Sequence, residues 1–399
     1  MASPKKSVLA DPILIFQLIL AAYACYATWG LNVLDGSVGR MLDIFKTDMP
    51  VLTGTNAPVK TRFTGIPPID YWIVFMIVFF WEALNGSHPA TIIEGLYFFG
   101  QVSALWTLMC LEGKRIGNQG LVVGKAMMWL YITHNLTIAC FAPIYFILHH
   151  QSSPTSRTTG VSTATHSRVL STIRHLRYLP LSIFLGLMVP FSYTGLPSPD
   201  VISYTAQQNA IAFTIFYPTW VVLLNYTFAW LDATFCSSDT PTDLHDVYMR
   251  ALRPVYIFAI VIGAFMHIGV VVTSLASVVF PGVFAPGIPE LFHPLNLLLP
   301  TNPPVYTIGA GIFNFMKRDQ WIGYLSMWLW VLKCYQENAE LAVKTWGQAM
   351  RRGVEVIASV SLLGAGGAAA LFLWRRDELL CVQEKADIQE KATNGRQKA

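Results

Sequence analysis

The 399-residue sequence is 54% hydrophobic and only 13% charged, with a mean hydropathy of +0.47. A soluble domain carries about a quarter charged residues because its surface faces water, so this composition excludes an ordinary soluble globule. The net charge of +4 arises from 27 basic and 23 acidic residues spread along the chain, and it indicates no nucleic-acid partner.

Apolar segments recur along the chain, many of them near the roughly 20 residues that a helical membrane span needs. Together they predict an all-α fold, a polytopic transmembrane helical bundle with eight or nine spans. The first segment also fits a signal peptide, since residues 22–24 resemble a cleavage site, but the run stays apolar beyond that point and favours a span. The segments are 13–31, 69–84, 90–111, 121–148, 178–193, 209–235, 251–280, 321–335 and 354–374.

The sequence predicts one domain, a helical bundle over residues 1–376, followed by a charged tail at 377–399 that is expected to be disordered. Two segments interrupt the bundle. Residues 149–177 are rich in Ser, Thr and basic residues and indicate a solvated loop. Residues 281–304 are apolar but crowded with proline, so we expect an interfacial or re-entrant loop there. The last span carries GAGGA at 364–368, small residues that allow helices to approach closely.

Ionisable side chains inside a membrane are costly, so each one is a candidate functional residue. Glu82 ends the second span, Glu94 lies near the start of the third, and Asp232 ends the sixth. Because even-numbered spans end on the side where odd-numbered spans begin, we expect these three carboxyls to share one face of the membrane. Gln101 and Asn225 lie seven residues from Glu94 and Asp232, two turns deeper on nearly the same helix faces.

Each candidate also has a structural interpretation. A carboxyl at a span end is often an interfacial residue among headgroups, and Glu94 would complement the dipole of its helix. His134 lies mid-span, where a histidine commonly bonds between helices, and Asn85 lies in the turn between two spans. Mid-span aromatic residues such as Trp106 and Trp220 either pack the bundle or line a pocket that stabilises a cation by cation–π attraction.

Motifs of cofactor and metal chemistry are absent from the sequence. It has no aspartate-rich diphosphate motif, no Walker loop, no Gly-x-Ser-x-Gly and no histidine-rich metal box, and its six cysteines form no CxxC. We therefore expect neither a metal nor a cofactor. ATP-driven transport and metal-dependent desaturation are poorly supported.

Several short strings of residues carry a resemblance to a known family. They are WEALNGSHP at 81–89, FGQ at 99–101, Trp106, EGKRIGN at 112–118 and PIY at 143–145. In these strings the chain resembles fungal integral-membrane proteins that include the terpene cyclases of ascofuranone- and macrophorin-type meroterpenoid pathways. The strings cover about a sixth of the chain, and the order of the spans extends the resemblance loosely over most of it.

The resemblance implies a multi-pass membrane enzyme of the isomerase or lyase type, which we expect in the endoplasmic reticulum. Its substrate would be a prenyl chain, such as farnesyl, attached to an aromatic or polyketide head group. A carboxylic acid would protonate a terminal alkene or epoxide, and the cation would run through the polyene until a proton is lost or a hydroxyl captures it. No diphosphate leaves in this chemistry, and a carboxyl buried in a low-dielectric bundle is expected to stay protonated.

Depth and span parity suggest roles for the polar candidates. We expect Glu94 or Glu82 to donate the proton, and Asp232 to be a partner carboxyl or the terminating base. Gln101 and Asn225 would orient the acid or the head group. We expect the substrate site also to include Asn85, His134, Trp106 and Trp220.

Two further expectations complete the sequence analysis. Glu112 and Arg115 end the third span at its other face and indicate an interfacial ion pair.

The main rival function is a small-molecule transporter or exporter of the same type of pathway, in which the proline-rich segment 281–304 would be a gate and buried acids would couple protons. No internal repeat, which many secondary transporters contain, is found between the two halves.

Overall fold

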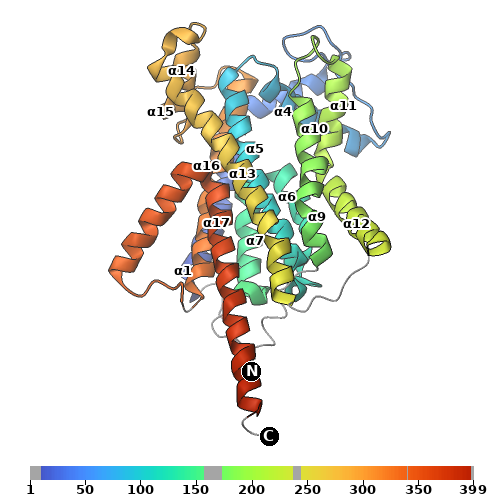
Figure 1. The fold of residues 1–399 in the computed structure, drawn as a ribbon. Helices are drawn as coiled ribbons and strands as arrows, with labels where there is room; N and C mark the ends of the chain where they lie inside the picture. The colour runs from blue at the N-terminus through green and yellow to red at the C-terminus, as the bar shows by residue number, and fades with distance from the viewer. Residues whose placement is uncertain (1–9, 157–172, 237–243, 339, 397–399) are drawn as a thin grey trace.

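The structure is a computed structural model that describes residues 10–156, 173–236, 244–338 and 340–396, without the side chains of 155, 244–246 and 384–396 (Figure 1). Over these residues the chain is helical, as predicted, and one isolated β-bridge joins Val51 to Pro58. The α-helices are α1 (Pro12–Cys25), α2 (Leu31–Leu34), α3 (Ser37–Leu42), α4 (Pro67–Leu84), α5 (Pro89–Lys114), α6 (Ala126–Leu136), α7 (Ile138–Ser152), α9 (Ile173–Ile183), α10 (Val189–Thr194), α11 (Tyr204–Ile215), α12 (Tyr217–Phe235), α13 (Leu244–Val279), α14 (Ile288–Phe292), α15 (Pro294–Leu297), α16 (Ile308–Gln336) and α17 (Trp346–Arg396).

Helix α5 forms the centre of the bundle and packs against α13, α16 and α17 (Figure 1). Every residue from Phe99 to Glu112 is buried, as expected for a helix that is covered on all sides. Helices α13 and α17 approach closely, because a Cβ built on Gly263 would lie 2.7 Å from the backbone nitrogen of Gly367. The close packing predicted for the small residues at 364–368 is therefore confirmed.

Helix α17 folds back on itself at Gly364. This residue has φ 72° and ψ 170°, a backbone conformation that is essentially restricted to glycine. Arg352, before the break, stands 4.6 Å from the ring centroid of Tyr335, and the Tyr335 hydroxyl donates to the carbonyl of Phe372, after the break, at 2.5 Å. Both arms of α17 therefore reach the end of α16, the lower end of the bundle in Figure 1.

Helices α6 and α7 form a second helical hairpin. Thr137 separates them with φ 90°, the only positive φ of a non-glycine residue in the described part of the chain. Helix α6 begins beside the C-terminal end of α5, where a Cβ on Gly113 would lie 2.8 Å from the Cβ of Ala126. Helix α7 returns to the same end, because His149 Nε2 lies 3.1 Å from Glu112 Oε2. The predicted span 121–148 therefore begins and ends at the same side of the bundle.

Six helices of the described chain are long and apolar enough to cross a membrane, or seven if the bent pair α11 and α12, which meet at 66°, counts as one span. The predicted number of eight or nine is not confirmed. Two predicted spans account for the difference. Segment 121–148 is the α6–α7 hairpin, and segment 321–335 lies in α16, which carries the polar run KRDQ at 317–320.

The predicted interruptions lie at the surface of the bundle. Helix α7 ends at Ser152 and α9 begins at Ile173, and residues 157–172 of the predicted polar loop lie outside the described part of the chain. The proline-rich segment 281–304 contains only short helices, including α14 and α15, at the upper end of Figure 1. Within the predicted tail, the backbone of α17 is helical as far as Arg396, and residues 397–399 lie outside the description.

Candidate active site

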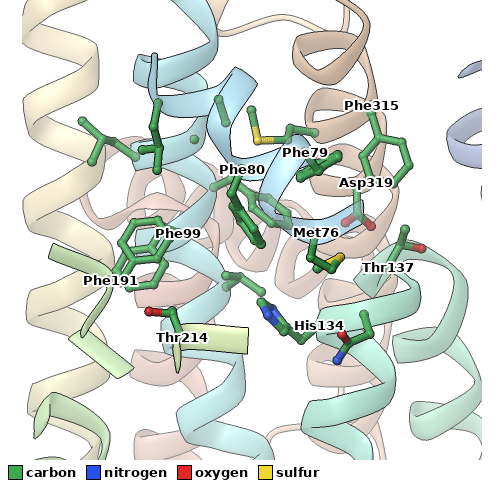
Figure 2. A pocket seen from close by; sticks show the side chains of 18 of the residues that line it. Met76, Phe79, Phe80, Phe99, His134, Thr137, Phe191, Thr214, Phe315 and Asp319 are labelled. Atoms are coloured by element: carbon green, nitrogen blue, oxygen red, sulfur yellow. The ribbon is translucent and has the colours of Figure 1, made fainter. Parts of the chain in front are cut away.

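A cavity of about 380 Å³ lies inside the bundle (Figure 2). Helices α4, α5, α6, α10, α11, α13 and α16 contribute to its wall. Its volume falls within the roughly 300–1,000 Å³ range of small-molecule pockets. Nine of its 27 lining residues are Phe or Trp, so the wall is largely aromatic.

The aromatic rings of the wall pack against one another from different helices. Phe79 on α4 meets Phe315 on α16 edge to face, with ring centroids 5.5 Å apart. Phe99 on α5 stacks on Phe191 of α10 with centroids 3.6 Å apart. The faces of such rings attract a cation, so the wall suits a ligand that is apolar but passes through a positively charged state.

Asp319 is the only carboxylic acid among the lining residues of the cavity. It lies on α16 and is 5% exposed. Its Oδ1 accepts a hydrogen bond from the backbone amide of Ala139 at 2.6 Å. Figure 2 shows its carboxyl beside Thr137 at one side of the cavity. A single acid thus faces a chamber whose other lining residues are mostly apolar.

The α6–α7 hairpin explains how this acid is held. The positive φ of Thr137 ends α6 and lets α7 begin inside the bundle, so the N-terminus of α7 points at Asp319. The first amides of a helix lack partners within the helix and carry a partial positive charge. The amide of Ala139 is one of these, and its hydrogen-bond acceptor is Asp319, which lies 180 positions later in the sequence. The strained backbone of Thr137 therefore helps to set the position of the Ala139 amide that holds the Asp319 carboxyl.

His134 is the second titratable side chain that lines the cavity. Its ring stacks on Phe80 at 6.0 Å and meets Trp106 and Tyr217 edge to face at 5.7 and 5.1 Å. In the described structure its Nε2 is buried without a hydrogen-bond partner. His134 was predicted at the substrate site, and the structure places it in the wall of the cavity.

The mouth of the cavity lies between α5 and α10. Leu96 of α5 is 38% exposed, and Ser192 of α10 is exposed as well. The stacked pair of Phe99 and Phe191 lies at this side of the cavity, and the neighbouring Val189 is 46% exposed. Apart from Ser192, these side chains at the mouth are apolar, so a lipid-dissolved molecule would meet little polar surface there.

Glu94 lies behind the wall of the cavity. It is fully buried, and its Oε1 accepts from Gln320 Nε2 of α16 at 3.0 Å. Its Oε2 has no partner among the described residues. Glu94 is not a lining residue, although the adjacent Gly95 is.

Glu82 and Asn85 lie at the upper end of α4. Glu82 is 2% exposed and does not line the cavity, whereas the adjacent Ala83 does. Asn85 Oδ1 accepts from the amide of Ser87 at 2.9 Å, so Asn85 caps the turn between α4 and α5. Burial of His88 in this turn lowers the pKa of its imidazole.

Asp232 lies at the opposite end of the bundle from Glu82 and Glu94. Its carboxylate pairs with Arg174 at 3.3 Å and Arg177 at 3.2 Å, at the start of α9. The expectation that the three carboxyls share one face is therefore wrong. The α6–α7 hairpin returns to its starting side, so the parity of every later span is reversed. The deeper amide of α12 also has a partner, because Asn225 Oδ1 lies 2.9 Å from Nδ1 of His175 and Asn225 Nδ2 donates to the His175 carbonyl.

Gln101 joins three helices instead of lining the cavity. Its Oε1 accepts from the amide of Gly366 at 2.9 Å, and its Nε2 donates to the carbonyl of Gly263 at 2.7 Å. It thereby satisfies backbone groups at the fold in α17. This contact explains the position of a buried amide in the middle of α5.

Of the two predicted tryptophans, the structure places one at the cavity. Trp106 lines it, and its indole donates to the hydroxyl of Thr133 at 3.1 Å. Trp220 does not line it. The indole of Trp220 donates to the carbonyl of Phe213 at 2.9 Å, and the two rings stack at 4.6 Å.

A buried network of charges joins α5, α7 and α17 near the lower end of the bundle. Arg115 bonds Glu112 at 2.9 Å and Asp377 at 2.7 Å, and Arg376 bonds Asp377 at 2.9 Å. These side chains are at most 2% exposed. The expected ion pair between Glu112 and Arg115 is therefore confirmed, but its expected interfacial position is wrong, because α17 covers the end of α5. The network lies at the C-terminal end of α5, away from the cavity.

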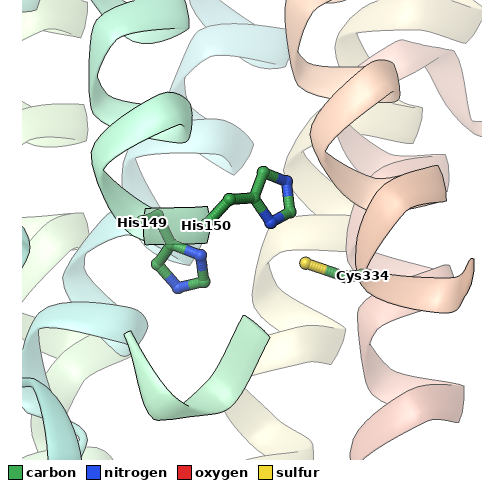
Figure 3. A group of neighbouring side chains, drawn as sticks. All are labelled: His149, His150 and Cys334. Atoms are coloured by element: carbon green, nitrogen blue, oxygen red, sulfur yellow. The ribbon is translucent and has the colours of Figure 1, made fainter. Parts of the chain in front are cut away.

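Next to this network, His149, His150 and Cys334 present atoms within 4.8 Å of one another (Figure 3). However, both ring nitrogens of His149 have partners. Nε2 faces Glu112 at 3.1 Å, and Nδ1 accepts from the indole of Trp330 at 3.2 Å. A metal ligand needs a free lone pair on nitrogen, so we assign no metal to this group.

Asp319 was not among the residues predicted from the sequence. The predicted eighth span, 321–335, began after the polar run at 317–320. A signal was present, because no proline interrupts the chain from residue 305 to 336, so a helix can extend through this run. An acid within such an extended helix would then have been a candidate.

Comparisons with known proteins support the sequence resemblance. The model of the CtvD domain family matches residues 12–381. The chain is similar to the terpene cyclase sdgD of Emericella nidulans, at 26% identity over 82% of this chain and 83% of that protein. It is also similar to the terpene cyclases ascI of Acremonium egyptiacum, at 24% identity over 92% and 93%, and ctvD of Aspergillus terreus, at 24% over 91% and 98%. No solved structure matches the chain.

Proposed function

The chain belongs to the CtvD domain family, and from this premise we propose that it is a membrane-bound terpene cyclase that closes the farnesyl chain of a meroterpenoid precursor after protonation. The similar proteins are named terpene cyclases. The observation that carries the proposal is a single acid, Asp319, in the wall of an aromatic cavity. The apolar helices support a membrane location, for which we propose the endoplasmic reticulum.

We assign the proton donor to Asp319. The amide of Ala139 bonds Oδ1, so Oδ2 is the oxygen that carries the proton in this proposal. A dry, apolar chamber favours the neutral acid before the reaction. After the proton has left, the N-terminus of α7 stabilises the carboxylate that forms. The hydrogen bond from Ala139 strengthens as negative charge develops on the carboxyl, so it stabilises the transition state of proton transfer more than the neutral acid.

The aromatic wall would guide the cation. Once Asp319 protonates the terminal alkene or epoxide, each ring closure moves the positive charge along the prenyl chain. Faces of Phe80, Phe99 and Trp106 line the same cavity and attract this charge at each position. Because little water reaches the chamber, the cation is protected from early quenching. Since no diphosphate leaves, the reaction needs no aspartate-rich metal motif.

The arrangement of the cavity suggests how the substrate lies. Asp319 and Thr214 line opposite sides of the cavity in Figure 2, and Phe191 of the mouth lies on the side of Thr214. The prenyl terminus would therefore enter first and reach Asp319. The aromatic or polyketide head group would stay near the mouth, beside the exposed Ser192.

The carboxyls proposed from the sequence rank behind Asp319 in this mechanism. Glu94 is the second candidate donor, because its neighbour Gly95 lines the cavity and one of its oxygens lacks a partner in the described structure. Glu82 is the third, next to the lining residue Ala83. Asp232 lies with two arginines at the other end, so the proposal gives it no chemical step.

Microsomes that contain the protein test the proposal. A panel of farnesylated phenols, with and without a terminal epoxide, is incubated and analysed by mass spectrometry and NMR. We expect a cyclised isomer of unchanged mass from the wild type, and its loss from Asp319→Asn at equal protein level. Asp232→Asn is the matched control and should keep the product. Movement of an unaltered compound across the vesicle membrane without any isomer would instead identify a transporter. Full activity of Asp319→Asn with none from Glu94→Gln would move the donor to Glu94.

A further inference from the structure

The cavity contains a second group that can exchange a proton with a bound molecule. Among its 27 lining residues only Asp319 and His134 titrate in the accessible range. Both belong to one chamber, yet they lie on different helices, α16 and α6 (Figure 2). A reaction that begins by protonation and ends by loss of a proton needs an acid and a base in one chamber.

The surroundings of His134 differ from those of other histidines in this bundle. Both ring nitrogens of His267 have partners, the hydroxyl of Tyr97 at 3.2 Å and the carbonyl of Ser361 at 3.0 Å. His149 likewise uses both nitrogens. Nε2 of His134 has no such partner among the described residues, and three aromatic rings pack around the imidazole. Its tautomer is therefore not fixed, and a lone pair is available.

The polar side chains next to His134 in the sequence, Thr133 and Asn135, are already engaged. Asn135 Oδ1 accepts from the indole of Trp72 at 2.8 Å. The hydroxyl of Thr133 accepts from Trp106 and donates to the carbonyl of Trp129. A buried lone pair without a hydrogen bond costs free energy. Nε2 of His134 carries such a cost, whereas the side chains of Thr133 and Asn135 do not.

We propose that His134 is the base that ends the cyclisation. This inference rests on the proposed function. When the last ring has closed, a ring nitrogen of His134 takes a proton from the carbon beside the cation, and the C–H electron pair becomes the new double bond. Where a hydroxyl of the substrate captures the cation, His134 takes the O–H proton instead. The substrate gains one proton at Asp319 and loses one at His134, so its mass and oxidation state do not change. Water that enters as the product leaves returns the proton to Asp319.

His134→Phe tests this role, because phenylalanine keeps the stacked ring and removes the lone pair. We expect the variant to consume the farnesylated phenols that the wild type consumes. The fraction of the wild-type product should fall at least tenfold, since a positioned base contributes about 10²–10⁴-fold to proton transfer. Double-bond isomers, or alcohols from capture of water, should replace it. Wild-type product at the wild-type rate from this variant would overturn the inference.

A second variant and a control separate chemistry from folding. His134→Ala leaves space for imidazole added to the medium, and recovery of the wild-type product with imidazole supports the role. Loss of conversion in His134→Ala and His134→Phe that imidazole does not restore overturns it. His267→Gln, which removes a fully bonded histidine away from the cavity, should lower the amount of protein at most and leave the product pattern unchanged. If the wild type itself yields no cyclised isomer, this result contradicts the proposed function, whatever the His134 variants do.

Discussion

Replacement of Gly364 by alanine tests what stabilises the sharp bend of α17 at this residue. Alanine rarely adopts φ 72° with ψ 170°, and a residue in this region of backbone space costs about 1–3 kcal/mol. The new Cβ would also lie 2.6 Å from Cδ of Gln101, so that side chain has to move. It then loses its bonds to Gly366 and Gly263, two buried contacts worth about 1 kcal/mol each. The total loss of stability is about 3–5 kcal/mol.

Thermal unfolding in detergent, followed by tryptophan fluorescence, measures this loss. Gly353→Ala is the matched control on the same helix, because a Cβ there meets no atom within 4 Å. The control should leave the unfolding temperature unchanged or raise it slightly, since alanine favours a helix over glycine by roughly 1 kcal/mol. Gly364→Ala should lower the temperature by about 4–6 °C. Equal unfolding of the two variants would refute the account of the break and of the role of Gln101.

Two more predictions concern buried cations outside the cavity. Arg115→Met removes one of the two arginines that pair with both Glu112 and Asp377 and should cost about 3–5 kcal/mol. Quantitative blotting of solubilised protein should show a severe loss, and normal amounts would contradict the structural role of the network. Lys317→Met removes the bonds from its ammonium to the carbonyl of Asn296 and the hydroxyl of Thr301, at 3.1 Å to the latter. The proline-rich segment should then be cleaved faster by protease, while Lys46→Met, in an exposed surface pair, should leave the cleavage rate unchanged.

Much of the fold could be predicted from apolar runs because lipid-facing helices need them. Helices α4, α5 and α13 lie where such runs occur, and Pro67 and Pro89 mark two of their starts. The hairpin of α6 and α7 could not be predicted in this way. A segment that turns back inside the bundle is as apolar as one that crosses it, and the turn at Thr137 depends on packing that is not visible in the sequence.

The candidate site was predicted only in part, for a related reason. His134 and Trp106 line the cavity as expected, whereas Gln101 and Asn225 bond other helices. Hydropathy shows that a polar side chain is buried but not which neighbour it faces. Asp319 was not predicted because the polar run at 317–320 of α16 is largely covered by protein, and a lipid-exposed stretch could not carry such a run.

The two hairpins have a consequence for how the protein is made. Ala139, at the first tip, bonds a residue that lies 180 positions later in the chain, and Gln101 bonds the second tip 265 positions later. While the ribosome is still translating α13, neither contact exists, and the amide of Ala139 lacks the acceptor that Asp319 later supplies. Early helices must therefore wait in the translocon or be sheltered by a chaperone until α16 and α17 arrive. The cavity, whose wall includes residues of α16, can form only after most of the chain has been made, so chains that end before α16 are expected to lack it.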